Sequence, residues 1–417
     1  MKKAVLLVTC SLLLTSMAPS ALGAYAGSQD STSVSAASSG SIIPQDKEGS
    51  VSFAALPERM LQNNLTIRNC QETLASYQAM DRQKAYDKLV NAINGLSDVV
   101  WGMSQSDKAG MMAGQIQQMQ SQVDSMREQL DDLKVEEYEK TMDNVARQIE
   151  NAIDQIIMGG ETLYITAVTY AHQVVDLDRS LVSLSRTLEE MEARYQRGQI
   201  SLLTLEQMRS TYSSTKSQAE TLSVAITNMK TSLESLLGET PTGKIELEPL
   251  PAIPTKDLDS MSFDADLAAA KEVSYAIYSA DKTLDDAKED WDDARKTYGS
   301  ASNYNYKMAE HTYQAAVFNH DAAIQSFQVS FDSLYRAVPD ARQALAAAQN
   351  ALAYQEQTYA ASELKYQQGN ISYNALLTEQ DSVDAARSKV TSAELTLFSA
   401  WNTYQWAVEQ GLLASSN

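Results

Sequence analysis

The chain has 417 residues with few glycines (16) and prolines (8), six Phe and four Trp, and a formal net charge of −21. Scarce helix breakers favour long helices, and the shortage of large aromatic side chains argues against a large aromatic-packed globular core. The strongly negative charge disfavours nucleic acid and anionic lipid as partners.

The N-terminus predicts export. Lys2 and Lys3 precede an apolar stretch of residues 4–14, and small residues follow up to Ala26. This order is typical of a cleaved signal peptide, whose apolar core is too short for a permanent membrane helix. We therefore expect a signal peptide at 1–26 and, because 27–50 is rich in Ser, Gly and Ala without periodicity, a disordered leader there. Cys70 then has no partner in the mature chain, so no disulfide framework is expected.

A proline-rich segment divides the remaining chain. Residues 238–262 contain half of all the prolines, at positions 241, 249, 251 and 254. No long helix tolerates this density, which predicts a linker. The expected units are a first helical-hairpin repeat at 51–237 and a second at 263–413.

Heptad spacing on both sides of the linker predicts coiled coils. Apolar residues step by three and four from Val174 to Tyr195, and again from Leu205 to Leu236. In the second repeat, large residues in the same register occupy Leu376, Val383, Val390, Leu397 and Tyr404. These positions lie 171 residues after their counterparts in the first repeat, so the register itself is duplicated.

One short motif interrupts each coiled coil at the same offset. Its two copies consist of Tyr195, Gly198, Gln199, Ile200 and Ser201, and of Tyr366, Gly369, Asn370, Ile371 and Ser372. The glycines predict left-handed helix ends, because glycine has no steric penalty there, and the serines predict N-caps of the next helix. Each copy is therefore expected to be the tip of an antiparallel helical hairpin.

Signals for chemistry are weak. The three histidines lack metal-ligand spacing, and no glycine-rich phosphate loop is present. The acidic run at 285–296 is typical of a solvated helix face, with metal binding as the weaker alternative. A methionine- and glutamine-rich run within 98–134 predicts an additional helical arm; a methionine metal site is the alternative. We expect no enzyme activity, no metal and no cofactor.

The paired tips, the coiled coils and the signal peptide resemble the outer-membrane efflux (TolC-like) protein family, most specifically over 193–238 and 363–411. The resemblance implies a homotrimer whose hairpins form a tunnel, and it implies a periplasmic adaptor and an inner-membrane pump as partners. It also implies that the two tips dock the adaptor and close the tunnel. The candidate gate acids are Glu206, Glu379 and Asp381.

The two places where the family inserts strand pairs, 101–114 and 298–308, are too short and read as turns between helices. The expected fold is therefore all-α, made of long antiparallel coiled-coil hairpins in two internal repeats, with the family's β-barrel strands reduced or absent. The leading hypothesis is an exported, passive conduit of an efflux or type I secretion system in the cell envelope, at the outer membrane by family resemblance. The alternative is a structural coiled-coil protein of the envelope that forms no channel.

Overall fold

The computed structural model describes residues 47 and 49–413, except 107–112 and 300–302. The expected signal peptide and nearly all of the expected leader lie outside this part. Within it the chain forms eleven helices and two short strands, which confirms the all-α prediction. In chain order they are β1 (Ser50–Val51), α1 (Leu56–Asn63), α2 (Leu65–Gln78), α3 (Arg82–Ser106), α4 (Ala113–Asp132), α5 (Val135–Gln196), α6 (Leu202–Leu236), β2 (Glu246–Leu247), α7 (Thr255–Asp259), α8 (Phe263–Val273), α9 (Tyr275–Tyr298), α10 (Tyr304–Gln367) and α11 (Tyr373–Glu409).

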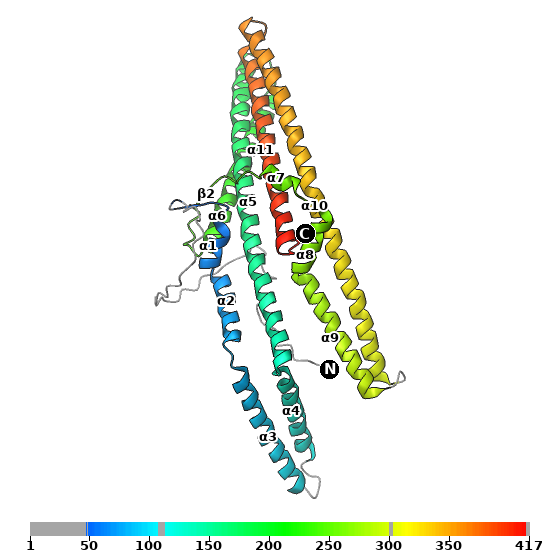
Figure 1. Cartoon of the computed structure of the whole chain (residues 1–417). Helices are drawn as coiled ribbons and strands as arrows, with labels where there is room; N and C mark the ends of the chain where they lie inside the picture. Colours follow the sequence, from blue (N-terminus) through cyan, green and yellow to red (C-terminus); the bar gives the residue numbers. More distant parts are fainter. Residues whose placement is uncertain (1–46, 48, 107–112, 300–302, 414–417) are drawn as a thin grey trace. The chain divides into compact units, whose positions relative to one another are not determined.

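Two long helical hairpins dominate the fold: α5 packs against α6, and α10 packs against α11 (Figure 1). The heptad positions form their inner seams. In the first hairpin Leu205, Ala219 and Leu233 are buried. In the second, the predicted positions Leu376, Val383, Leu397 and Tyr404 are buried, and Val390 is half-buried. The predicted coiled-coil register is therefore confirmed.

Each hairpin ends, away from its tip, in its own hydrophobic cluster. In the first cluster β1, α1 and α2 pack on α5 and α6, around fully buried Leu56, Met60, Tyr164 and Leu233. In the second cluster α8 and α9 pack on α10 and α11, around Phe327, Phe331 and Tyr404. Local aromatic packing therefore exists, and most of it lies at the bases of the hairpins.

The proline-rich segment is more ordered than a free linker. Its strand β2 pairs in parallel with β1, so Ser50, the last residue of the expected leader, lies opposite Glu246. Tyr164 of α5 donates its hydroxyl to backbone carbonyls of both segments, Val51 at 2.9 Å and Glu248 at 2.7 Å. The segment also contains the one-turn helix α7, because prolines are tolerated before a helix start. It is thus tied to the base of the first hairpin.

The additional arm is itself a pair of helices, α3 packed on α4. The methionines 119 and 126 lie half-buried at the spacing of a packing seam, while methionines 111 and 112 lie outside the described residues. The expected turn at 101–114 begins later than predicted, because α3 continues through Ser106. Likewise α10 already begins at Tyr304, within the segment expected to be a turn.

The glycine pair Gly159-Gly160 predicts a weak point in the helix that leads to the first tip, and this prediction is wrong. Both glycines lie inside α5, and the helix break instead falls between Asp132 and Val135. Gly160 serves packing: a Cβ there would lie 2.5 Å from Met60 Sδ, whereas Gly159 has open space. A glycine can therefore mark the close approach of a neighbouring helix rather than a bend.

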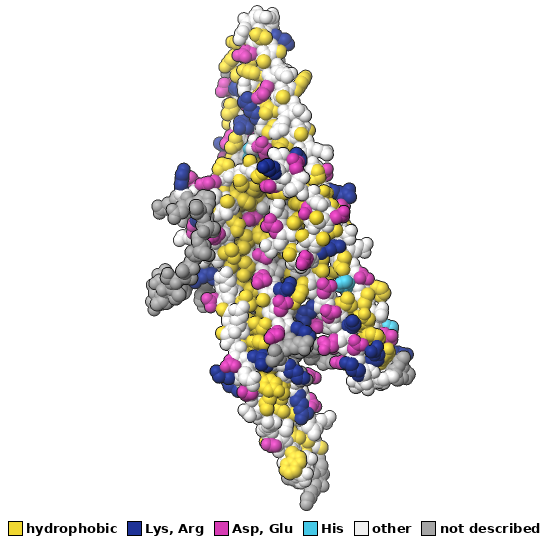
Figure 2. Space-filling model, viewed as in Figure 1, with side chains coloured by type: hydrophobic (Ala, Val, Ile, Leu, Met, Phe, Trp, Pro, Cys, Tyr) yellow, Lys and Arg dark blue, Asp and Glu magenta, His cyan; other side chains and the backbone are white. Residues whose placement is uncertain are grey.

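The surface carries both signs of charge. In Figure 2, acidic and basic side chains are interspersed over the hairpins, and hydrophobic side chains gather near the middle of the view, where α5 lies. Among the helices that the structure describes, none combines the length and the apolarity needed to cross a bilayer.

Candidate functional site: hairpin tips and the contact between hairpins

The two tips have the same backbone geometry. Gly198 and Gly369 are left-handed, with φ of +69° and +74°. Ser201 Oγ accepts the amide of Thr204, and Ser372 Oγ accepts the amide of Ala375, both at 3.2 Å. The predicted glycine ends and serine N-caps are confirmed.

The tips expose apolar side chains to solvent. In the first tip Tyr195 is 40% exposed, and the next residues after the turn, Leu202 and Leu203, are 52% and 69% exposed. In the second, Tyr366 and Tyr373 are 39% and 57% exposed, with ring centroids 5.8 Å apart. Gln199 and Asn370 are exposed in the turns, and Ile200 and Ile371 are partly covered.

The three candidate gate acids have different surroundings. Glu206 pairs with Arg209, which also bonds Glu192, so it acts within the first hairpin. Glu379 accepts from Gln355 Nε2 at 3.2 Å, within the second hairpin. Asp381 alone reaches across the hairpins, where it accepts Arg186 Nη2 at 2.6 Å and Ser183 Oγ at 2.9 Å. The structure therefore singles out Asp381 as a contact between hairpins.

Asp381 belongs to a row of polar contacts between α5 and α11, which we call the polar ladder. On α5 its members Glu161, His172 and Ser183 recur every eleven residues, about three helical turns, and so share one stripe. At the far end Glu161 accepts Asn402 Nδ2 at 2.9 Å and Trp406 Nε1 at 2.6 Å. Its full set of members is Glu161, His172, Asp176, Ser183 and Arg186 on α5, with Asp381, Ser388, Asn402 and Trp406 on α11.

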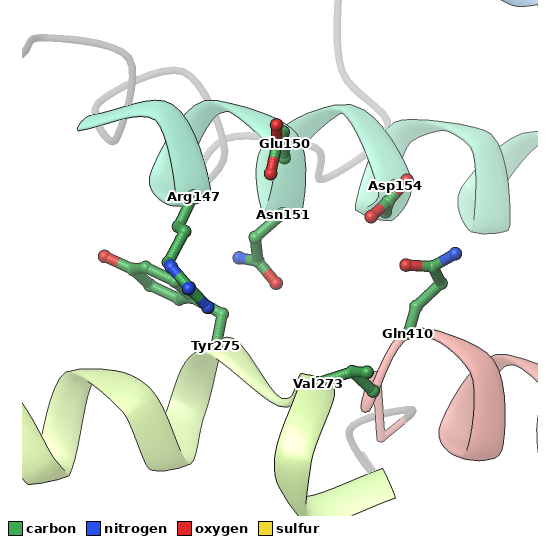
Figure 3. Close-up of a pocket in the computed structure, with 7 residues that line it drawn as sticks. All are labelled: Arg147, Glu150, Asn151, Asp154, Val273, Tyr275 and Gln410. Atoms are coloured by element: carbon green, nitrogen blue, oxygen red, sulfur yellow. The ribbon is translucent and has the colours of Figure 1, made fainter. Parts of the chain in front are cut away.

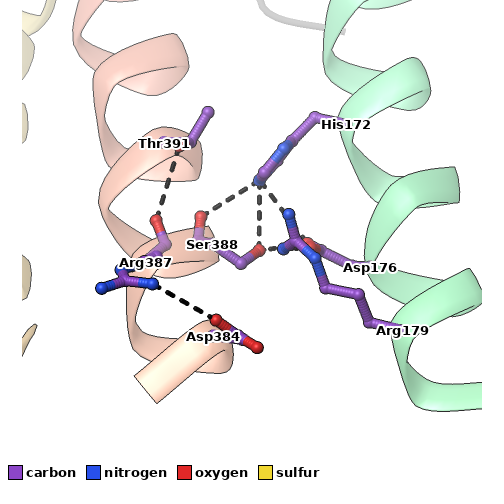
Figure 4. A network of polar contacts seen from close by, with 7 residues as sticks. All are labelled: His172, Asp176, Arg179, Asp384, Arg387, Ser388 and Thr391. Carbon is purple, nitrogen blue, oxygen red and sulfur yellow. Dashed lines mark hydrogen bonds and ion pairs between the residues drawn. The ribbon is translucent and has the colours of Figure 1, made fainter. Parts of the chain in front are cut away.

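The middle of the polar ladder contains Ser388, His172 and Asp176 (Figure 4). His172 Nε2 lies 3.1 Å from the Ser388 carbonyl oxygen and 3.2 Å from Ser388 Oγ, and Ser388 Oγ donates to Asp176. The trio is not a hydrolase triad, because Asp176 contacts the serine hydroxyl and the same ring nitrogen, Nε2, rather than orienting the opposite nitrogen. Ser388 is also buried.

An open groove of about 390 Å³ separates the Glu161 and His172 contacts. Ile165, Leu395 and Ala400 give it apolar walls. The hydroxyls of Thr166, Thr169, Thr396 and Thr403, which also line it, bond to carbonyls one turn back in their own helices. Along this stripe the two hairpins thus meet at separate polar points. At the base they also meet through apolar side chains, because Trp406 packs on the first hydrophobic cluster and the Phe398 ring lies 5.0 Å from the Phe53 ring.

A smaller polar cavity of about 90 Å³ lies between α5 and the α8–α9 junction (Figure 3). Asp154 and Gln410 point toward one another across it. Burial, and then the neighbouring Glu150, raises the pKa of Asp154. Nearby, the Arg147 guanidinium lies 4.5 Å from the centre of the Tyr278 ring. In the described residues no group of three or more His, Cys, Asp or Glu side chains is arranged to hold a metal ion.

The sequence reveals little of the polar ladder. It presents His172 only as a candidate metal ligand, and it gives no signal that singles out Glu161 or Trp406. The eleven-residue spacing on α5 is a weak signal, because polar residues at such positions more often face solvent. Their partners lie about 200 residues away, which no local pattern reveals.

No protein-family model and no curated protein match the chain. Solved structures do match. The outer membrane protein VceC from Vibrio cholerae has 13% identity and a TM-score of 0.49, over 86% of this chain and 96% of that one. A membrane protein from Pseudomonas aeruginosa has 12% identity and a TM-score of 0.49, over 84% and 89%.

A third match is the open state of the Neisseria gonorrhoeae MtrE outer membrane channel, with 14% identity and a TM-score of 0.47, over 86% of this chain and 89% of that one. The three matches are thus an outer membrane protein, a membrane protein and an outer membrane channel. These matches provide no residue-level correspondence, so the function proposed below depends on the contacts of this chain.

Proposed function

We propose that the chain is an exported component of an efflux or secretion conduit in the cell envelope, with residues 1–26 removed on export. In this proposal three copies assemble around a passage, and the tips meet a periplasmic adaptor attached to an inner-membrane pump. The conduit itself is passive, and the pump supplies the energy.

The observation that carries this proposal is the contrast between the two kinds of helix contact. Each hairpin is a unit with an apolar inner seam, whereas α5 and α11 meet through the polar ladder. Polar contacts exchange readily with water, so the tip-side ends of two rigid hairpins can part at Asp381, while Trp406 and Phe398 of α11 keep their apolar contacts at the base of the first hairpin. A gate needs this combination of stiff arms and a separable contact.

Asp381 has the central role in the proposed gate. It lies nine residues after Ser372, the N-cap of its tip, and it connects to Arg186 and Ser183 of the other hairpin. In the closed arrangement this contact holds the tips together, and partner docking at the exposed apolar tip side chains would break it.

Locking the hairpins tests the gate. In the native host, a Ser183→Cys/Asp381→Cys variant joined by a short reducible cross-linker should block efflux of a dye panel, and a reductant should restore it. The matched control places one cysteine alone, at Ser183. Efflux that is unaffected by the cross-link, in cells where deletion of the gene raises dye accumulation, would contradict the gate but not the conduit.

Assembly tests the conduit itself. Light scattering of the purified mature chain should give the mass of three copies. A chain that stays monomeric at high concentration, with no change in dye accumulation on deletion, would favour the structural envelope protein instead.

A further inference from the structure

Glu161 is a buried carboxylate at the contact between the hairpins. Its side chain belongs to α5, and the residue is 6% exposed. Both of its hydrogen-bond donors, Asn402 Nδ2 and Trp406 Nε1, belong to α11 and reach the same oxygen, Oε2. Among the described residues Glu161 has no ion pair. When α5 and α11 part, the carboxylate therefore loses both of its hydrogen-bond donors, and water can take their place.

The charged groups around Glu161 do not compensate it. Glu409 on α11 has the same sign and opposes its ionisation. On α1, Arg59 is engaged with Glu239 and with the Ser50 carbonyl. On α6, Glu234 is bound by loop amides. On α5 itself, Tyr164 donates its hydroxyl to the Val51 and Glu248 carbonyls. The nearest acid and histidine along this helix are Asp154, which lines the cavity of Figure 3, and His172, which bonds Ser388.

We infer that Glu161 makes the contact between the two hairpins pH-sensitive, so that α5 and α11 hold together more firmly in acid than at neutral pH. The inference concerns this contact alone and does not require the chain to be a conduit. Protonation of Oε1 leaves Oε2 free to accept from Asn402 and Trp406, so the neutral acid keeps both hydrogen bonds. The ionised form keeps them too, but its charge is buried without a cation.

The direction of this pH dependence follows from the hydration of the Glu161 carboxyl group in the two arrangements. Burial raises the pKa of Glu161 in the joined hairpins, and the two hydrogen bonds offset this only in part. Once α11 has left, water restores the ordinary value. The added stability of the joined form is therefore complete below the ordinary glutamate pKa and is lost as the pH rises through the raised value.

Hydrogen exchange of the whole mature chain measures the parting of the helices. Amides of residues 397–409 are compared in wild type and Glu161→Gln at the same pH, so that intrinsic exchange rates cancel. Gln keeps an acceptor oxygen and cannot ionise. At pH 8 we expect wild type to exchange about threefold faster than the variant, and at pH 5 we expect equal rates. The same ratio of wild-type to variant exchange rates at pH 8 and at pH 5 would overturn the inference.

The control is Glu189→Gln, an exposed glutamate on the same helix, which should show no pH-dependent ratio. A second measurement covers the case in which Glu161→Gln does not fold. In wild type, the indole N–H resonance of Trp406, assigned through Trp406→Phe, should titrate with a midpoint above that of an ordinary glutamate. A Trp406 resonance that does not move above pH 5 would also overturn the inference.

Discussion

The seam inside each hairpin and the polar ladder between the hairpins differ in chemistry and in sequence distance. The seam between α5 and α6 buries Leu205, Ala219 and Leu233, from heptads that a single tight turn brings together. The polar ladder joins residues about 200 positions apart through hydrogen bonds and one ion pair. Burying apolar area stabilises a contact far more than half-exposed polar pairs do, so the molecule concentrates its stability within hairpins.

Two buried glutamates, Glu234 and Glu161, differ in the same way. Glu234, at the base of the first hairpin, accepts the amides of Thr242, Gly243, Lys244 and Ile245. Burial opposes its ionisation, but these backbone donors outweigh it and lower the pKa of Glu234 to about 2. Glu161 has only two side-chain donors, and its pKa is raised. The ionised form of Glu234 is thus stabilised by its backbone donors, whereas the ionised form of Glu161, between the two hairpins, is not compensated to the same extent.

The largest effect is expected at the hairpin seam. Leu233→Ala removes a fully buried side chain between α6 and its neighbours and should cost about 2–5 kcal/mol of unfolding free energy, because it leaves a cavity. Chemical denaturation measures this cost. Leu203→Ala, on the same helix but 69% exposed, should change stability by less than about 0.5 kcal/mol. Similar losses at both positions would remove the distinction between seam and surface.

Glu234→Gln should cost about 1–3 kcal/mol, because the amide replaces one acceptor oxygen that receives backbone N–H groups. Since the folded pKa is lowered, the contribution of Glu234 is present above the ordinary glutamate value of 4.5 and lost as the pH falls toward 2. Wild type should therefore approach the variant in thermal stability in this window. The exposed Glu220→Gln on α6 is the control, and a constant gap between wild type and Glu234→Gln would contradict this assignment.

At the tips, Gly198→Val or Gly369→Val should cost about 1 kcal/mol or more, because a β-branched residue resists positive φ. Asn tolerates this region better, so Gly198→Asn should lose less. Gly159→Ala, in open space within α5, should gain up to about 1 kcal/mol. Thermal unfolding compares the four variants, and a Val variant as stable as wild type would exclude a strict requirement for the left-handed turn.

The smallest effect is expected in the polar ladder. Arg186 and Asp381 are each about one-third exposed, so their coupling should be at most about 1 kcal/mol and should fall with added salt. A double-mutant cycle of Arg186→Ala and Asp381→Asn, followed by chemical denaturation, measures it. A coupling free energy as large as the Leu233→Ala loss would mean that the two hairpins are held together too tightly to part, which would contradict the proposed gate.

Local sequence patterns are enough to predict the helices, the duplicated seams and the two tips. These features depend on local chemistry: heptad spacing sets which face of a helix is apolar, a glycine permits the left-handed end, and a serine three positions later caps the next helix. The sequence also predicts Asp381 as a candidate acid, because it lies close to a tip. It does not predict Arg186 as the partner of Asp381.

The polar contacts between the repeats, and the anchoring of the proline-rich segment, become visible only in the folded chain. Periodicity defines a face but not the register at which a distant helix lies against it, so Arg186–Asp381, His172–Ser388 and Glu161–Trp406 could not be derived from spacing. The same limit applies to Gly160: the sequence predicts a weak point there, whereas in the structure this glycine leaves room for the Met60 side chain. Contacts between segments far apart in sequence depend on how the side chains of two whole helices fit together, so no short stretch of sequence specifies them.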